Sequence, residues 1–270
     1  MEIQDILYAQ GFGTRRVCAG LVQQGWVQVR EAAADAGAAD GWRPCAAAHE
    51  DVETDGLLLR VQGVEWEYHA QAYLMLHKPA GTECSQKPST YPSIYTLLPA
   101  PLRQRPSKHA IQGVQAVGRL DQDTTGLLLL SDDGQFIHRM SSPKKHVPKV
   151  YEIGAKHPVD ARQVACLLEG VVLDDDPKPV RAAACERVED PAAPGETRHL
   201  RMTLTDGKYH QVKRMLAAVG NRVETLHRSR IGGLVLDGLA PGQWRWLRPA
   251  DLALLQPLPS PARVAQTPAA

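Results

Sequence analysis

The sequence predicts an α+β protein built around a largely antiparallel sheet. Segments with the pattern of β-strands outnumber segments with helical periodicity, and they rarely alternate one for one with them. Of the 270 residues, 43% are hydrophobic, which is enough for an ordinary packed core in one large domain or in two smaller ones. No apolar run is long enough to cross a membrane, and the N-terminus lacks the basic start and apolar centre of a signal peptide. We therefore expect a cytoplasmic protein.

The N-terminal segment predicts two helices followed by a strand. Thr14 is placed to cap the second helix, Gly25 ends it, and residues 26–29 alternate as a strand does. Arg15 and Arg16 occupy the first turn of that helix, where the helix dipole disfavours cations. We therefore expect an anionic partner at this turn; the alternative is a plain helical hairpin that packs on the main domain.

An acidic, alanine-rich stretch (residues 31–48) follows and predicts a flexible connection. Beyond it, the predicted strands are residues 73–79, 126–130, 150–153, 180–187, 199–205, 223–227, 233–236 and 244–247. The predicted helices are a short one through Phe136 and Met140, one from Pro158, and an amphipathic one over residues 209–219.

Two carboxylates, Asp121 and Asp123, lie on a predicted loop directly before the strand at 126–130. A tight loop between strands fixes a side chain and exposes its tip, which is how a catalytic acid, base or nucleophile is presented. Two alternatives fit the same residues. Magnesium-dependent aspartyl phosphatases share Asp-x-Asp-x-Thr, but their motif follows a buried parallel strand, and here Arg119 precedes the pair. In the other alternative, the aspartates simply cap a turn.

Basic residues gather on both sides of this loop although the net charge is only +1. Residues 138–149 hold four Lys or Arg and no acid, and residues 198–230 hold eight against two acids. A phosphate-rich ligand would explain two such runs. Tyr151, beside the first run, is of the kind that stacks an unpaired base. The five cysteines are scattered without a CxxC pair, so we expect neither a disulfide framework nor a zinc site.

The segments GRLDQDTTGLLLLSDDG, KVYEI, GKYHQVKRMLAAVGN and LHRSRIGG, in this order, resemble the pseudouridine synthases of the ribosomal small-subunit synthase A family and their large-subunit relatives. The resemblance covers roughly residues 73–255, and the N-terminal segment more loosely resembles an S4-type RNA-binding module. It implies a pseudouridine synthase fold, with a mixed, mainly antiparallel sheet and flanking helices, after a small S4-like α/β module. The implied domains are 1–70 for RNA binding, including the acidic insert, 71–256 for catalysis, and 257–270 as a disordered tail.

The resemblance also implies the residues that act. It assigns the catalytic aspartate to Asp121, the active-site tyrosine to Tyr151 and the active-site cation to Lys213, which would keep Asp121 ionised. Arg119 matches the arginine that helps to displace the target base. The RNA-binding residues that we expect are Arg15, Arg16, Arg119, Arg139, Lys144, Lys145, Lys149, Lys208, His210, Arg214 and Arg228.

The implied activity is the isomerisation of a specific uridine to pseudouridine in small-subunit (16S) ribosomal RNA. Enzymes of this family break the N-glycosidic bond, turn the base and rejoin it to the sugar through C5, with no metal and no cofactor. The expected partner is 16S rRNA or a small-subunit assembly intermediate, and we expect a monomer that binds no membrane. A synthase for large-subunit (23S) rRNA and a non-catalytic RNA-binding protein of ribosome assembly are the alternatives.

Overall fold

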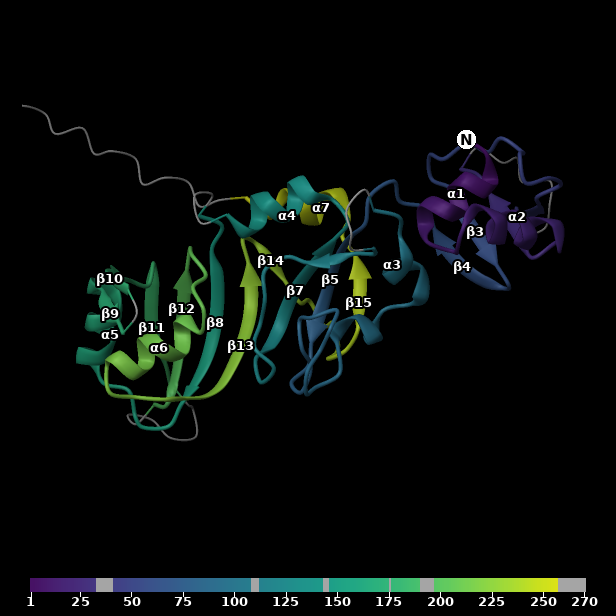
Figure 1. Ribbon diagram of the computed structural model, residues 1–270. Helices are drawn as coiled ribbons and strands as arrows, with labels where there is room; N and C mark the ends of the chain where they lie inside the picture. Colours follow the sequence, from purple (N-terminus) through teal and green to yellow (C-terminus); the bar gives the residue numbers. More distant parts are fainter. Residues whose placement is uncertain (33–40, 108–111, 143–145, 175, 190–196, 257–270) are drawn as a thin grey trace, which may run out of the picture. The chain divides into compact units, whose positions relative to one another are not determined.

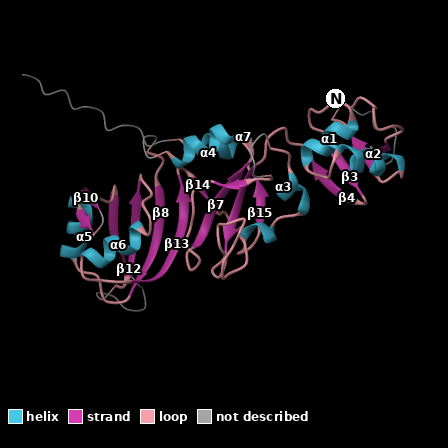
Figure 2. Ribbon diagram, in the orientation of Figure 1, coloured by secondary structure: helices cyan, strands magenta, loops and turns pink. Residues whose placement is uncertain are grey.

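The computed structural model describes residues 1–32, 41–107, 112–142, 146–174, 176–189 and 197–256. Both helices and strands run through the chain, which confirms the α+β class (Figures 1 and 2). The predicted tail, 257–270, and residues 33–40 of the predicted flexible stretch lie outside the described residues. The first of two compact units comprises Met1–Leu74, Ile94–Ala116 and Leu130–Ile137, and the second comprises Met75–Ser93, Val117–Leu129 and His138–Ala270. The RNA-binding role of residues 1–70 and the catalytic role of 71–256 stay predictions.

The first unit begins with the predicted helices α1 (Ile3–Gln10) and α2 (Arg15–Gln23) and strand β1 (Val27–Arg30). As expected, Thr14 caps α2, because its hydroxyl accepts a hydrogen bond from the Val17 amide. The strands pair in the order β2-β1-β3-β4. The other three are β2 (Arg43–Pro44), β3 (Leu58–Val61) and β4 (Val64–Glu67).

The β3–β4 hairpin was not predicted from the sequence. Its turn places Gln62 and Gly63 at φ values of 51° and 82°. Two successive positive φ angles match the right-handed twist of the flanking strands and make a tight two-residue turn. Glutamine rarely adopts this conformation, so the Gln-Gly pair gave a weaker turn signal than Asn-Gly would have given.

The rest of the first unit contains the 3₁₀ helix η1 (Ile94–Leu97), α3 (Ala100–Gln104) and β6 (Gln115–Ala116). Strand β6 pairs antiparallel with the end of β7 (Thr125–Ser131). The segment before the Asp121 loop is therefore a short antiparallel strand. An aspartyl phosphatase needs a buried parallel strand there, so the phosphatase alternative is wrong.

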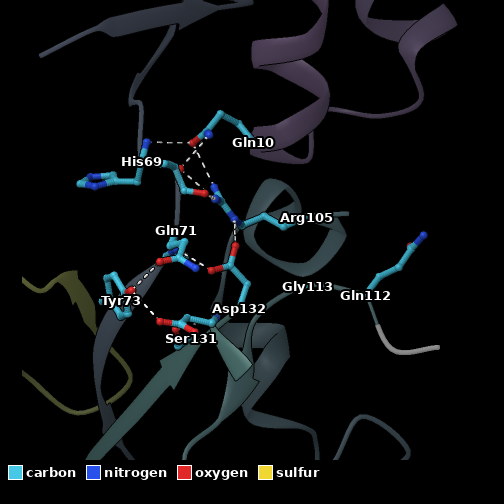
Figure 3. Close-up of polar contacts among 12 residues, drawn as sticks. Gln10, His69, Gln71, Tyr73, Arg105, Gln112, Gly113, Ser131 and Asp132 are labelled. Carbon is cyan, nitrogen blue, oxygen red and sulfur yellow. Dashed lines mark hydrogen bonds and ion pairs between the residues drawn. The ribbon is translucent and has the colours of Figure 1, made fainter. Parts of the chain in front are cut away.

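A buried arginine ties together distant segments of the first unit (Figure 3). Arg105 is 1% exposed, and its Nε donates to the carboxylate of Asp132. Its Nη1 donates to Gln10 at 3.0 Å, and its Nη2 donates to the backbone oxygens of His69 at 2.8 Å and Ala70 at 3.1 Å. A buried charge is tolerated only when it is paired and hydrogen-bonded in this way.

The main sheet has the strand order β11-β12-β8-β13-β7-β5-β15, with β14 pairing β13 and β6 pairing β7. Strand β8 pairs antiparallel with β12 and β13, whereas β13 and β7 are parallel, which confirms a mixed, mainly antiparallel sheet. Its strands not yet given are β5 (Tyr73–Lys78), β8 (Lys149–Ala155), β11 (Ala184–Val188), β12 (His199–Leu204), β13 (Val223–Ile231), β14 (Leu234–Val235) and β15 (Trp244–Trp246).

Helices α5 (Ala161–Glu169) and α6 (Gln211–Ala218) lie on one face of the sheet in Figure 1. Helix α5 packs against β11, and α6 packs against β13 and β9 (Val171–Leu173). Two further helices are α4 (Gly134–Ser141) and α7 (Pro249–Ala253).

Three predicted boundaries were wrong. The predicted helix over 209–219 begins only at Gln211, because His210 has a left-handed backbone. Helix α5 begins at Ala161 and not at Pro158, because Asp160 caps it. The predicted strand 180–187 is two strands, β10 (Asp176–Val180) and β11, of which β10 pairs with β9.

We expect Arg105→Met to lower the free energy of unfolding by about 3–5 kcal/mol, because it leaves the carboxylate of Asp132 without its buried cation. Urea unfolding measures the change. Arg103→Met is the matched control, since Arg103 is exposed on the same helix and its loss should cost at most about 0.5 kcal/mol. Equal losses in the two variants would contradict the importance of the Arg105 network.

Candidate active site

A cavity of about 430 Å³ opens in the second unit beside the loop of residues 117–124. Its wall also includes parts of β8, β13 and the segment 204–213, which reaches the first turn of α6. Asp121, Tyr151 and Lys213, the three predicted catalytic residues, all line it. The structure thus brings them to one site, and their roles stay predictions.

Asp121 is held through both of its carboxylate oxygens. Nε2 of His210 lies 3.2 Å from Oδ1, and Nζ of Lys213 lies 3.1 Å from Oδ2. The Asp121 side chain keeps 27% of its surface exposed. Contacts on both oxygens fix the plane of the carboxylate, so Asp121 can meet a bound molecule in one orientation.

Lys213 bridges the two aspartates of the loop. Its Nζ lies 2.7 Å and 2.9 Å from the two oxygens of Asp123, in addition to its contact with Asp121. Burial opposes the charge of Lys213, but the hydrogen bonds to Asp123 and Asp121 outweigh burial and raise the pKa of the ammonium group. Burial also opposes the charge of Asp123, and the hydrogen bond from Lys213 outweighs it and lowers the pKa of that carboxyl. Lys213 therefore stays charged and ties the loop to α6.

His210, predicted only as an RNA-binding residue, contacts Asp121 directly. Its φ is 50°, a left-handed conformation that costs a non-glycine residue roughly 1 kcal/mol. Its ring stacks on exposed Tyr209 with 3.7 Å between the ring centroids. No local pattern indicates this backbone conformation, so the contact between His210 and Asp121 was not predicted.

Lys78, which was not predicted from the sequence, anchors the loop of residues 117–124. It lies fully buried at the end of β5, and its Nζ donates to the backbone oxygens of Thr124 at 2.9 Å and Pro79 at 3.0 Å. A longer contact of 3.4 Å reaches the backbone oxygen of Gln122. Burial lowers the pKa of Lys78. A lysine close after the apolar residues Leu74, Met75 and Leu76 was the only indication of this role in the sequence.

Strands β8 and β13 supply the sheet side of the cavity with Lys149, Tyr151 and Arg228. Burial lowers the pKa of Lys149 to about 8; the charge of Arg228 acts in the same direction, and that of Asp206 opposes it. On this side of the cavity, burial and the neighbouring cation therefore make it easier for Lys149 to lose its proton.

The structure separates the predicted RNA-binding residues into groups. Those that line the cavity are Arg119, Lys149, Lys208, His210 and Arg228. Arg139 on α4 and Arg214 on α6 are not among the residues that line the described cavity. Arg15 and Arg16 belong to the first unit, where Arg15 pairs with Asp5 at 2.7 Å. Lys144 and Lys145 lie outside the described residues.

Within the described part of the chain, no three side chains of His, Cys, Asp or Glu gather closely enough to hold a metal ion. None of the described helices has the length and apolar character needed to cross a membrane.

Comparisons with known proteins show which proteins this chain is similar to. A family model for RNA pseudouridylate synthase matches residues 72–218. Ribosomal small subunit pseudouridine synthase A of Escherichia coli (strain K12) is 39% identical over 75% of this chain and 79% of its own. An uncharacterised RNA pseudouridine synthase of Bacillus subtilis (strain 168) is 36% identical over 94% of this chain and 98% of its own. A crystal structure of a pseudouridylate synthase covers 94% of this chain and 99% of its own, with a TM-score of 0.60 and 29% identity.

We expect Lys149→Met to raise the free energy of unfolding at pH 7 by roughly 1–3 kcal/mol. The pKa of Lys149 is about 8 in the folded protein against an ordinary 10.5, so below pH 8 the folded state carries a disfavoured charge. Between pH 8 and 10.5 the folded state loses this proton first, so the gain should shrink towards zero. Urea unfolding at pH 7 and pH 10 measures it. Lys156→Met, at an exposed position just after β8, should show no gain, and a gain independent of pH would contradict the prediction.

Proposed function

Since the chain belongs to the RNA pseudouridylate synthase family, and is thus an RNA pseudouridine synthase and an isomerase, we propose that it converts a specific uridine of small-subunit (16S) ribosomal RNA to pseudouridine. The small-subunit assignment is supported by the names of relatives, the ribosomal small subunit pseudouridine synthases A of Escherichia coli and Pasteurella multocida, each 39% identical. The protein acts as a cytoplasmic monomer, without metal or cofactor, on this RNA or on an assembly intermediate that contains it.

The position of Asp121 carries the catalytic assignment. Of the two aspartates on the loop, Asp121 lines the cavity and Asp123 does not; Asp123 instead forms the outer contact of Lys213. The contacts with His210 and Lys213 orient the Asp121 carboxylate, and the buried ammonium of Lys78 holds the backbone on which it sits. A reactive group needs such a fixed geometry to act on one atom of its substrate.

Access to the uridine requires that the base leave its stack in the folded RNA. Flipping costs a few kcal/mol and is offset by stacking and edge contacts in a pocket. Tyr151 lines the cavity from β8 and supplies the stacking surface. Arg119, exposed at the same cavity, fills the space that the base vacates. Asp121 then acts on the ribose or the base as nucleophile or base, by attack at C1′ or through a glycal.

Cations around the cavity and in the N-terminal segment bind the RNA backbone. Lys208 lines the cavity, and Arg15 and Arg16 begin α2 of the first unit. Phosphate contacts of this kind give affinity that falls steeply with salt. We therefore assign residues 1–70 to RNA binding and 71–256 to catalysis.

We expect Asp121→Asn to reduce conversion by roughly 10³-fold or more while RNA affinity stays within about threefold, because the amide keeps the shape of the side chain but loses its reactivity. Tritium release from C5-labelled 16S rRNA, with a chelator present, measures conversion, and filter binding measures affinity.

Asp123→Asn is the matched control, since it removes the neighbouring carboxylate that also contacts Lys213. It should keep conversion within about tenfold of the unmodified protein. Release that survives in Asp121→Asn, or vanishes equally in both variants, would refute the assignment of Asp121. Release from 23S rRNA alone would refute the small-subunit proposal.

The double variant Arg15→Gln, Arg16→Gln tests the role of the N-terminal segment. We expect weaker RNA binding, by roughly 5–10-fold at low salt, and a salt dependence reduced by about two counterions, since each arginine contacts one phosphate. Single-turnover rates at saturating RNA should stay unchanged. Arg187→Gln, at an exposed position on β11, should leave both quantities unchanged. Undiminished affinity of the double variant would count against this RNA-binding surface.

A further inference from the structure

Two cations share one face of the sheet with Tyr151. Arg228 on β13 pairs directly with Tyr151 on β8, and Lys149 precedes Tyr151 by two residues on the same strand. Directly paired residues, and residues two apart on a strand, point to the same face of a sheet. All three line the cavity. A base stacked on Tyr151 would therefore have both cations beside its edge.

Arg228 is buried, and one of its guanidinium nitrogens has no hydrogen-bond partner among the described residues. It is 3% exposed, and its Nε donates to the backbone oxygen of Leu127 at 2.7 Å. Its Nη2 is buried and has no hydrogen-bond partner among the described residues. A buried donor left unsatisfied is costly, and a guanidinium carries five donors in a rigid plane. The geometry leaves Nη2 available to an acceptor that enters the cavity.

Lys149 lies beside Arg228 without a carboxylate partner. Its Nζ donates to the backbone oxygen of Val147 at 3.2 Å, and within the described structure neither cation forms an ion pair. The acid whose charge raises the pKa of Lys149 is Asp206. The carboxylate of Asp206 already accepts a hydrogen bond from Gln211 at 2.8 Å. By contrast, Lys213 is neutralised by two aspartates. Of these three cavity cations, Lys213 is neutralised by aspartates, whereas Lys149 and Arg228 have no carboxylate partner among the described residues and can bind an anion or a carbonyl group.

We propose that Lys149 and Arg228 contact the carbonyl oxygens of the flipped uracil and stabilise the negative charge that the base carries once its bond to the ribose has broken. The proposal rests on the proposed function, because it requires a uridine whose base stacks on Tyr151. It makes Lys149 and Arg228 catalytic residues in addition to Asp121.

The charge arises as follows. When the C1′–N1 bond breaks, its electron pair stays with the base, which becomes a uracil anion with charge shared by N1, O2 and O4. The ribose makes up its deficit at C1′ by a bond to the Asp121 carboxylate, or by losing a proton to it. In the second half, C5 bonds to C1′ while the bond from C1′ to the Asp121 carboxylate breaks or, on the glycal route, while Asp121 returns the proton that it took from C2′. The C5 proton is then lost to a base, and N1 takes up a proton. The sum is an isomerisation, and the anion is the species that fixed positive charge stabilises.

The burial of Arg228 favours the base over a backbone phosphate as the bound group. Phosphates of a bound strand run along the outside of a site, where exposed Arg119 is available. Arg228 lies instead beneath the surface, next to buried Tyr151, where a flipped base reaches and its backbone does not. Cations held in such a dry site act more strongly on developing charge than cations in water.

Single-turnover rates at saturating RNA, measured separately from RNA affinity, test the proposal. Lys149→Met should slow conversion by about 100-fold, the usual loss for one preorganised donor, with affinity changed less than about threefold. Lys149→Arg keeps the charge and should restore most of the rate. Lys156→Met removes an exposed lysine just after the same strand and should leave rate and affinity unchanged. Arg228→Gln should also slow conversion, with Arg228→Lys recovering part of the loss.

The same variants should lose less on RNA that carries 5-fluorouridine at the target. Fluorine withdraws electrons and stabilises the uracil anion, so cleavage then depends less on the cations. Mass spectrometry measures consumption of the target nucleoside, and the same measurement serves for RNA with uridine and for RNA with 5-fluorouridine. A structural role would lower both rates equally, and that result would overturn the proposal. Weaker RNA binding with a smaller salt dependence and an unchanged saturated rate would assign the pair to a phosphate and also overturn it.

These results are distinguishable from failure of the proposed function. If the unmodified protein converts 23S and not 16S rRNA, the small-subunit proposal fails. The Lys149 variants can then still be compared on 23S rRNA, so the role of Lys149 remains testable. If Asp121→Asn keeps its activity, the assignment of Asp121 fails, and the effect of fluorine on the Lys149 and Arg228 variants still decides the role of the two cations.

Discussion

The site depends on one buried ammonium group. Lys78 is removed from water at the end of β5, and a buried charge is tolerated only if polar groups surround it. The surrounding groups are backbone oxygens of Pro79 and Thr124, with Gln122 further away. The need to satisfy Lys78 therefore fixes the backbone on which Asp121 sits. The loop is exposed at its tip, but its backbone is held in place because the buried ammonium group of Lys78 needs the backbone oxygens of the loop as hydrogen-bond acceptors.

The same loop leads into a close approach of two strands. Gly126 on β7 pairs with Arg228 on β13, and its φ is 112°. A Cβ atom at Gly126 would lie 2.3 Å from the Arg228 backbone oxygen, so the approach requires glycine. Strand β13 then pairs with β8 and brings Arg228 opposite Tyr151. The carboxylate loop and the cationic side of the cavity are thus fixed by one continuous set of strand contacts.

Sequence patterns predicted the parts whose signal is local. The Asp121 loop, its following strand and the amphipathic face of α6 each depend on residues near one another in the chain. Lys78 could not be found in this way, because its acceptor at Thr124 is 46 residues away and is a backbone group. The left-handed backbone of His210 and the turn at Gln62 were missed for a different reason. Both are unfavourable locally and are maintained by the surrounding fold, which overrides residue preference.

The distribution of charge explains why the cavity is built at a cost to stability. Lys213 is matched by Asp121 and Asp123, so it holds the loop without attracting further anions. Arg228 is buried and Lys149 is half-buried, with no such match among the described residues, and folding alone gives no reason to place them there. Natural sequences keep destabilising groups of this kind mainly where function needs them. A substrate that becomes negative only during the reaction satisfies that need, because the cations then favour the reacting state over the bound uridine.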